Sequence, residues 1–75
     1  MTKEEFLAEF QEMLQRDDPV KEEMPLASLE EWDSLARMVL IAFFDRTFGQ
    51  QIKFDAFNAC RTVADLMALA QGAIA

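Results

Sequence analysis

The sequence predicts an all-α fold: a four-helix up-and-down bundle of three main helices and one short helix, with a long loop after the first. Apolar residues recur at helical spacing, and no stretch shows the strict alternation of a strand. Cap and stop signals divide the chain into segments of helical length, and the 52% apolar content is ample for a folded core. We expect residues 1–75 to form one small domain.

The first helix is expected from about Lys3 to Arg16. Thr2 and Glu5 have the spacing of a capping box, in which each side chain accepts a hydrogen bond from the backbone of the other residue. Asp17-Asp18-Pro19 should end the helix, because proline cannot continue it. Its apolar stripe comprises Phe6, Phe10, Met13 and Leu14.

A long loop, roughly Val20 to Asp33, should follow the first helix. Loops of this length are uncommon in compact domains and are usually functional. This one holds apolar anchors, which predict a loop attached across helix ends: Met24, Leu26, Leu29 and Trp32. Trp32 either packs the loop onto the helices or stacks on a ligand or partner, and packing is favoured.

The second helix is expected from Ser34 to Phe48, with Gly49 just after its end. One apolar stripe should face the core and comprises Leu40, Ile41, Phe44 and Phe48. The other comprises Leu35, Met38 and Ala42. A domain of this size cannot cover every side of such a helix, so we expect the second stripe to be an exposed contact surface beside Ser34. Alternatively, the long loop covers it.

The remaining chain predicts a short helix and a final one. Residues 55–59 can form one turn, and a helix is expected over about 63–74. Thr62 and Asp65 have capping-box spacing at its start. Its inner face comprises Val63, Leu66, Met67 and Ala70.

The net charge of −7 is concentrated in the first half of the chain. Residues 1–33 carry eleven Asp/Glu and three Lys/Arg, whereas residues 34–75 carry three and four. An acidic surface disfavours nucleic acid and favours basic protein partners, although it can also be merely solvated. The longest apolar run, Met38 to Phe44, is too short to insert across a membrane, and the polar start is not a secretory signal. We expect a cytoplasmic monomer.

Residue usage argues against catalysis and metal binding. The chain has no histidine and a single cysteine, so neither a zinc site nor an internal disulfide is expected. Cys60 is expected to be a small buried hydrophobic residue, with a reactive thiol as the alternative. Ser34 has no base to activate it, so we expect no catalytic residues and no enzyme activity.

Ser34 is the candidate functional residue. Asp33 is a suitable N-cap, which places the Ser34 hydroxyl on the first helical turn. Free backbone N–H groups and the helix dipole favour an anion there, as a phosphate ester would supply. Ser34 is therefore better read as a residue that is modified than as one that attacks.

These residues resemble the acyl carrier protein family over essentially the whole chain. The family's attachment motif, Asp-Ser-Leu, is present as Asp33-Ser34-Leu35. Its spacing to Phe48-Gly49 and to Thr62-Val63, together with the Leu26–Leu29 segment upstream, also matches.

The resemblance implies a carrier that performs no catalysis itself. A phosphopantetheinyl transferase would attach 4′-phosphopantetheine to Ser34 from coenzyme A with magnesium, and the arm would hold an acyl group as a thioester. Asp33 would cap the helix and assist the transferase. Leu35 and Met38 would contact partners, namely acyl-loading and acyl-processing enzymes (a ligase, synthase or transferase) of fatty-acid-like, polyketide or other specialised synthesis. Arg37, one turn from Ser34, is a further candidate for partner contact.

The sequence departs from the family in two ways. The second helix of the family is usually acidic, but here Ala36, Arg37, Val39 and Arg46 occupy the corresponding surface, which favours a dedicated partner set. Three alternatives are open for Arg37 and Arg46: they are solvated, they pair with acids of the first helix and the loop, or they dock partners. The second departure is aromatic bulk that would narrow an acyl cavity and limit long cargo: Phe43, Phe44, Phe48, Phe54 and Phe57.

Two other functions remain open. A peptidyl carrier loads amino acids, but its motif usually has Gly or His before the serine, and Asp33 disfavours it. An unmodified carrier-like adaptor would use the same apolar stripe without an arm.

Overall fold

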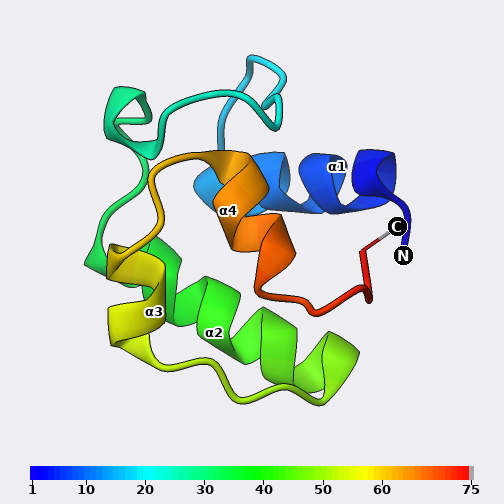
Figure 1. The fold of residues 1–75 in the computed structure, drawn as a ribbon. Helices are drawn as coiled ribbons and strands as arrows, with labels where there is room; N and C mark the ends of the chain where they lie inside the picture. Colours follow the sequence, from blue (N-terminus) through cyan, green and yellow to red (C-terminus); the bar gives the residue numbers. More distant parts are fainter. Residues whose placement is uncertain (75) are drawn as a thin grey trace.

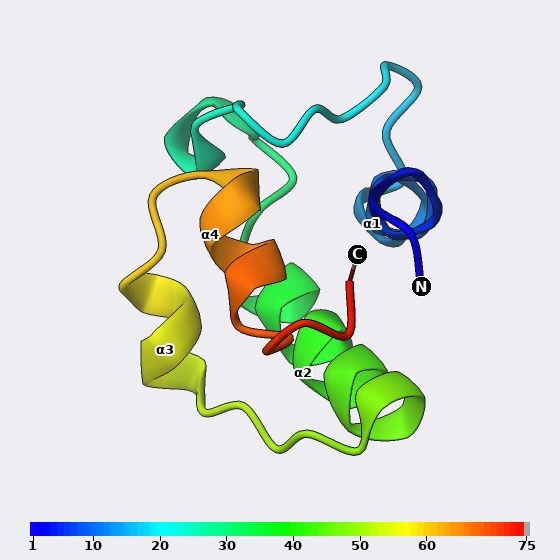
Figure 2. The same ribbon diagram turned by 45° about the vertical axis from the view of Figure 1, so that its right-hand side comes forward.

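The computed structural model describes residues 1–74 and confirms the predicted all-α bundle. The helices are α1 (Lys3–Leu14), the 3₁₀ turn η1 (Leu26–Ser28), α2 (Ser34–Phe48), α3 (Phe54–Asn58) and α4 (Val63–Ala68). In two views the loop after α1 passes over α4, and α3 lies beside the first half of α2 (Figures 1 and 2). None of the helices described within residues 1–74 is both long and apolar enough to cross a membrane.

The two capping boxes form as predicted. Thr2 Oγ1 accepts a hydrogen bond from Glu5 N at 3.1 Å, and Glu5 Oε1 accepts one from Thr2 N at 2.8 Å. Thr62 and Asp65 repeat this arrangement at the start of α4. Each box satisfies N–H groups that have no acceptor inside the helix, so both helix starts lie where the sequence places them.

Helix ends differ from the prediction more than helix starts do. The first helix ends at Leu14 and not at Arg16, because Gln15 adopts the left-handed conformation with φ 55°. The N–H groups of Gln15 and Arg16 then donate to the carbonyls of Glu12 and Gln11 and close the last turn. The last helix ends at Ala68 and not near residue 74, since the chain continues in tight i→i+3 turns to left-handed Gln71 and Gly72. The short helix is shifted by one residue, and α2 has the predicted bounds.

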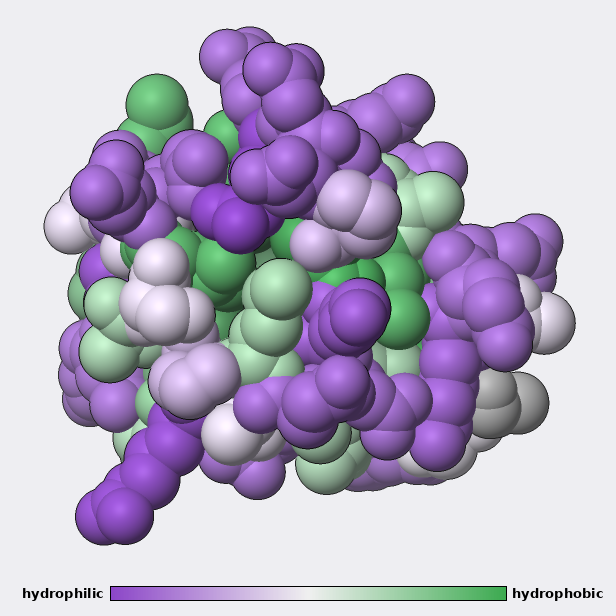
Figure 3. Space-filling view, turned by 90° about the horizontal axis from the view of Figure 1, so that it is seen from above, coloured by the Kyte–Doolittle hydropathy of each residue, from purple (hydrophilic) through white to green (hydrophobic). Residues whose placement is uncertain are grey.

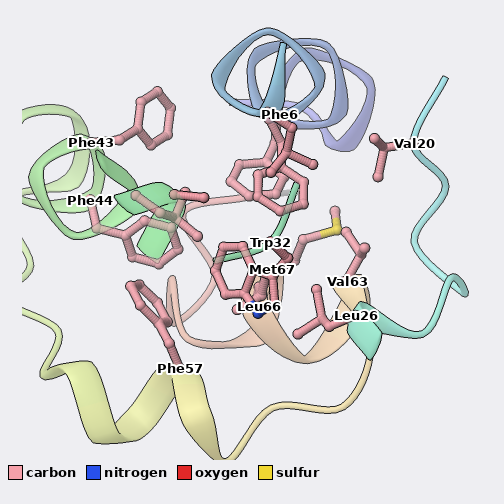
Figure 4. Packing of buried hydrophobic residues seen from close by; sticks show 14 of the residues in the cluster. Phe6, Val20, Leu26, Trp32, Phe43, Phe44, Phe57, Val63, Leu66 and Met67 are labelled. Atoms are coloured by element: carbon pink, nitrogen blue, oxygen red, sulfur yellow. The ribbon is translucent and has the colours of Figure 1, made fainter. Parts of the chain in front are cut away.

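Aromatic side chains dominate the core. Phe6, Phe44 and Phe57 are fully buried, and Phe44 lies 5.7 Å from Phe57 between ring centroids. These two rings lie edge to face between α2 and α3 (Figure 4). The predicted inner face of α4 is also buried: Val63, Leu66, Met67 and Ala70. The aromatic rings therefore fill the space between α2 and α3, while the expected limit on cargo length stays a prediction.

The long loop is attached to α4 by backbone hydrogen bonds. Val63 N donates to Met24 O at 3.1 Å, and Ala64 N donates to Glu22 O at 2.8 Å. Leu26 N donates in turn to Arg61 O at 2.8 Å. The loop carbonyls thus satisfy the first N–H groups of α4, which otherwise lack acceptors. The anchors Leu26, Leu29 and Trp32 are buried, so the prediction of an attached loop is confirmed.

Candidate functional site

Ser34 is the first residue of α2, and its side chain is exposed. Asp33 is the N-cap: its Oδ1 accepts a hydrogen bond from Ala36 N at 2.9 Å, and its carbonyl accepts one from Arg37 N at 3.1 Å. No hydrogen bond within residues 1–74 uses the N–H of Ser34 or Leu35. Two free donors and the positive end of a 15-residue helix therefore surround the hydroxyl, and both favour an anionic group there.

Trp32 fixes the chain immediately before this site. The indole is buried, and its ring centroid lies 5.6 Å from that of Phe10 and 6.2 Å from that of Phe57, with edge-to-face geometry in both cases. It therefore packs the end of the loop against α1 and α3, as the sequence favoured.

An ion pair that the sequence did not predict supports the same segment. Arg16 Nη1 donates to Glu31 Oε1 at 3.1 Å and joins the end of α1 to the loop. The backbone N–H of Glu31 itself, and secondarily Arg16, lower the pKa of that carboxyl. Glu31, two positions before Asp33, is thus held by Arg16, which lies two residues beyond the end of α1.

An exposed apolar surface begins next to Ser34. The exposed fractions are 70% for Leu35, 60% for Met38 and 41% for Val39, and Ala42 is also exposed. The predicted second stripe is therefore open to solvent. The alternative, in which the loop covers it, is wrong, because the loop packs on α4 instead. Val39 belongs to this surface although the i, i+3, i+7 pattern did not place it in the second stripe.

Two predictions about the surface of α2 need correction. Ala36 is buried beneath the first turn, so it is not part of the exposed face. Arg37 does not pair with an acid of α1 or the loop: its guanidinium lies 5.1 Å from the ring centroid of Trp32 and 5.9 Å from that of Phe54. The ion pairs among residues 1–74 are Lys3–Glu22 and Arg16–Glu31, so Arg46 has no such partner either.

Cys60 is half-buried and not fully buried as expected. Its thiol donates a weak hydrogen bond to Ala56 O at 3.4 Å. Burial, followed by the charge of Asp65, raises the pKa of the Cys60 thiol, which suppresses its nucleophilic thiolate form. Within the part of the chain that the structure describes, no group of His, Cys, Asp and Glu side chains is arranged to hold a metal ion.

The surface above the loop and α1 is mostly hydrophilic, with hydrophobic side chains visible in the furrows between polar ones (Figure 3). Residues 1–33, which include α1 and the loop, carry eleven of the fourteen Asp and Glu side chains. Glu31 and Asp33 line one hollow together with Leu35 and Val39, so acidic side chains border the start of the exposed apolar stripe of α2.

The chain matches a model of a known protein family. A family model described as phosphopantetheine attachment site matches residues 4–70, which is most of the chain. Domains of this family carry a covalently attached 4′-phosphopantetheine group, interact with phosphopantetheinyl transferases and acyl-processing enzymes, and are carriers without catalytic activity. No curated protein and no solved structure matches the chain significantly.

Proposed function

The chain belongs to the phosphopantetheine attachment site family, the domain of acyl carrier proteins, and we propose that residues 1–75 form one acyl carrier domain whose arm is attached to Ser34. The observation that carries the proposal is the exposed hydroxyl of Ser34 on the first turn of α2. A phosphodiester fits this position, since the N–H groups of Ser34 and Leu35 have no protein acceptor within residues 1–74.

The other serine of the chain fits the role less well. Ser28 is also exposed, but its hydroxyl donates a 2.7 Å hydrogen bond to Pro25 O inside η1. It lies in a three-residue 3₁₀ turn with no comparable set of free N–H groups. Ser34 is therefore the better acceptor of the two.

Attachment is a transfer catalysed by a partner enzyme. Ser34 Oγ forms a P–O bond to the β-phosphorus of coenzyme A, the pyrophosphate bond breaks, and adenosine 3′,5′-bisphosphate leaves. The hydroxyl proton is lost to a base of the transferase or to solvent, and magnesium stabilises the departing phosphate. The carboxylate of Asp33 helps the transferase to recognise this turn, in addition to capping the helix.

The attached arm supplies a terminal thiol that holds an acyl group as a thioester. Tethering raises the effective concentration of that group at the active site of each partner enzyme. Leu35 and Met38 offer partners an apolar contact surface next to the attachment point. Coenzyme A as the donor and a single half-buried cysteine favour a cytoplasmic location.

Acyl cargo is favoured over an aminoacyl group because an aspartate, and not glycine or histidine, precedes the serine. The candidate pathways are fatty-acid-like, polyketide or other specialised acyl synthesis. An adaptor without an arm would use the same exposed surface of α2 but would leave Ser34 unmodified.

Intact-mass measurement tests the attachment. The protein is incubated with coenzyme A, magnesium and a broad-specificity phosphopantetheinyl transferase. We expect a mass gain of one phosphopantetheinyl group in the native protein and in Ser28→Ala, and no gain in Ser34→Ala. An unmodified native protein, or a gain that persists in Ser34→Ala, rules out the proposal.

A further inference from the structure

A hollow of about 490 Å³ lies between the η1 segment of the loop and the α3–α4 region. Its apolar wall comprises Leu26, Leu29, Trp32 and Phe57, and two arginines, Arg37 and Arg61, also line it. Arg37 follows Ser34 by three residues, about one turn of α2. The hollow therefore begins close to the proposed attachment point.

The charge of the hollow is opposite to that of the protein. The chain has fourteen carboxylate side chains and seven basic ones, yet among the described residues no carboxylate lines this hollow. The acid that interacts with Arg61 is Asp65, whose carboxylate accepts hydrogen bonds from the backbone N–H groups of Arg61 and Thr62. Both arginines thus line the hollow, and neither forms an ion pair with a carboxylate among the described residues.

Arg37 is held in place rather than free in solvent. Trp32 and Phe54 lie against its guanidinium at 5.1 and 5.9 Å from their ring centroids. Its Nε is buried and has no hydrogen-bond partner within residues 1–74. Stacking fixes the plane of the guanidinium but leaves N–H donors unused, so the group is preorganised for an acceptor.

An unsubstituted alkyl chain is a poor occupant of this hollow. It would cover the arginine N–H groups and give them no acceptor, which is unfavourable because a buried donor without a partner loses its hydrogen bonds to water. A chain that ends in a carboxylate avoids this cost. Its methylene groups can lie on the apolar wall while its anionic end accepts charge-assisted hydrogen bonds from the guanidinium groups.

We propose that this hollow selects acyl cargo with a distal carboxylate, which Arg37 and Arg61 bind while Trp32 and its apolar neighbours contact the methylene chain. The inference rests on the proposed attachment at Ser34 and adds the class of cargo. Arg37 then acts on the cargo side of α2, facing the loop and α3, and not on the exposed face of Leu35 and Met38.

Three cargoes with the same six-carbon chain test the proposal. A broad-specificity transferase loads the protein from adipyl, adipamoyl or hexanoyl coenzyme A, which end in a carboxylate, a neutral amide and a methyl group. ¹⁵N NMR then follows the side-chain N–H signals of Trp32 and Arg37, relative to the protein with an unacylated arm. We expect the adipyl group to shift both signals, and the other two groups to shift them less than half as much.

Substitutions of arginine show whether the guanidinium groups cause the shift. Arg37→Gln and Arg61→Gln should each reduce the adipyl-specific shift of the Trp32 indole at least threefold. Arg46→Gln is the matched control, because Arg46 is an exposed arginine of α2 that does not line the hollow, and it should leave the shift unchanged. If Arg37→Gln does not fold, the exposed Arg61 still provides the test through Arg61→Gln.

The two proposals fail in distinguishable ways. A protein that gains no mass from any acyl coenzyme A disproves the attachment itself. A protein that loads all three groups, but in which adipyl and hexanoyl shift Trp32 equally, remains a carrier and overturns the cargo class. The proposed cargo class is also overturned if the adipyl-specific shift persists in both Arg37→Gln and Arg61→Gln. The same conclusion follows if Arg46→Gln reduces that shift as much as they do.

Discussion

Replacing Asp33 with alanine should destabilise the protein through one identified hydrogen bond. Asp33 Oδ1 accepts from Ala36 N at 2.9 Å, and Ala36 is buried, so water cannot readily replace the lost acceptor. Loss of an N-cap side chain costs about 0.5–2 kcal/mol, and an unsatisfied buried N–H places Asp33→Ala near the upper end, at about 1.5–2 kcal/mol. For a domain of this size that corresponds to a decrease in Tm of roughly 6–16 °C.

Asp33→Asn is the matched variant, because asparagine caps helices about as well as aspartate. Its side-chain oxygen can accept the same hydrogen bond from Ala36 N, so we expect its free energy of unfolding within about 0.5 kcal/mol of the native value. Urea unfolding followed by circular dichroism measures both variants. Equal losses in Asp33→Ala and Asp33→Asn, or no loss in either, would refute the assignment of the hydrogen bond as the source of stability.

The variants Asp33→Ala and Asp33→Asn also distinguish two roles of Asp33 in the transferase reaction: capping the helix and presenting a negative charge to the enzyme. If the transferase recognises the carboxylate, Asp33→Asn remains folded but is loaded about tenfold more slowly, the effect of losing one charge-assisted hydrogen bond worth about 1.4 kcal/mol. Glu30→Gln is the control, since Glu30 is an exposed carboxylate three residues upstream. Loading of Asp33→Asn at the native rate would show that Asp33 acts only through the helix cap.

Three further predictions follow from burial and titration. Phe44→Ala removes a fully buried ring with four aromatic neighbours. It should lower the free energy of unfolding by about 3–5 kcal/mol, and a near-native urea midpoint would contradict this. Backbone N–H donors hold the pKa of Glu5 and that of Asp65 below the ordinary values of these carboxyl groups. The stabilisation is therefore present above the unfolded-state pKa and is lost as pH falls through the lower folded-state pKa. As the pH is lowered from 6 to 3, the urea midpoint of a Glu5→Gln/Asp65→Asn double variant should fall less steeply than that of the native protein. An identical slope in the two proteins would disprove the link between these carboxylates and stability. Leu35→Ala and Met38→Ala should change stability by less than about 0.5 kcal/mol because both side chains are exposed, but should raise the KM of the transferase for the carrier; an unchanged KM would remove them from the contact surface.

The sequence predicts those features that depend on neighbouring residues. The capping boxes at Thr2 and Thr62, the cap at Asp33 and the left-handed Gly49 each involve residues within a few positions of one another, and all four are present. Their hydrogen bonds close inside one turn, so local spacing is sufficient to specify them.

Features that depend on contacts between distant segments could not be predicted in this way. The stacking of Arg37 between Trp32 and Phe54 requires the loop and α3 to meet on one side of α2. The ion pair between Arg16 and Glu31 likewise requires the actual path of the loop. The sequence pattern left three alternatives for Arg37 and Arg46: solvation, pairing with acids, or docking of partners. It shows which residues are close along the chain, but not which residues come together when the chain folds.

The site is therefore specified at two levels that perturbation can separate. The position of Ser34 on the first turn of α2 is specified locally, since it depends on the cap formed by Asp33. The surroundings of the site depend on α4, because loop carbonyls accept hydrogen bonds from Val63 and Ala64, and this attachment holds the segment that ends at Trp32. Since Trp32 both anchors that segment and stacks on Arg37, the folding of the loop also sets the position of the guanidinium. The attachment point and the surface proposed to select its cargo thus share one structural support, although only the first can be read from adjacent residues.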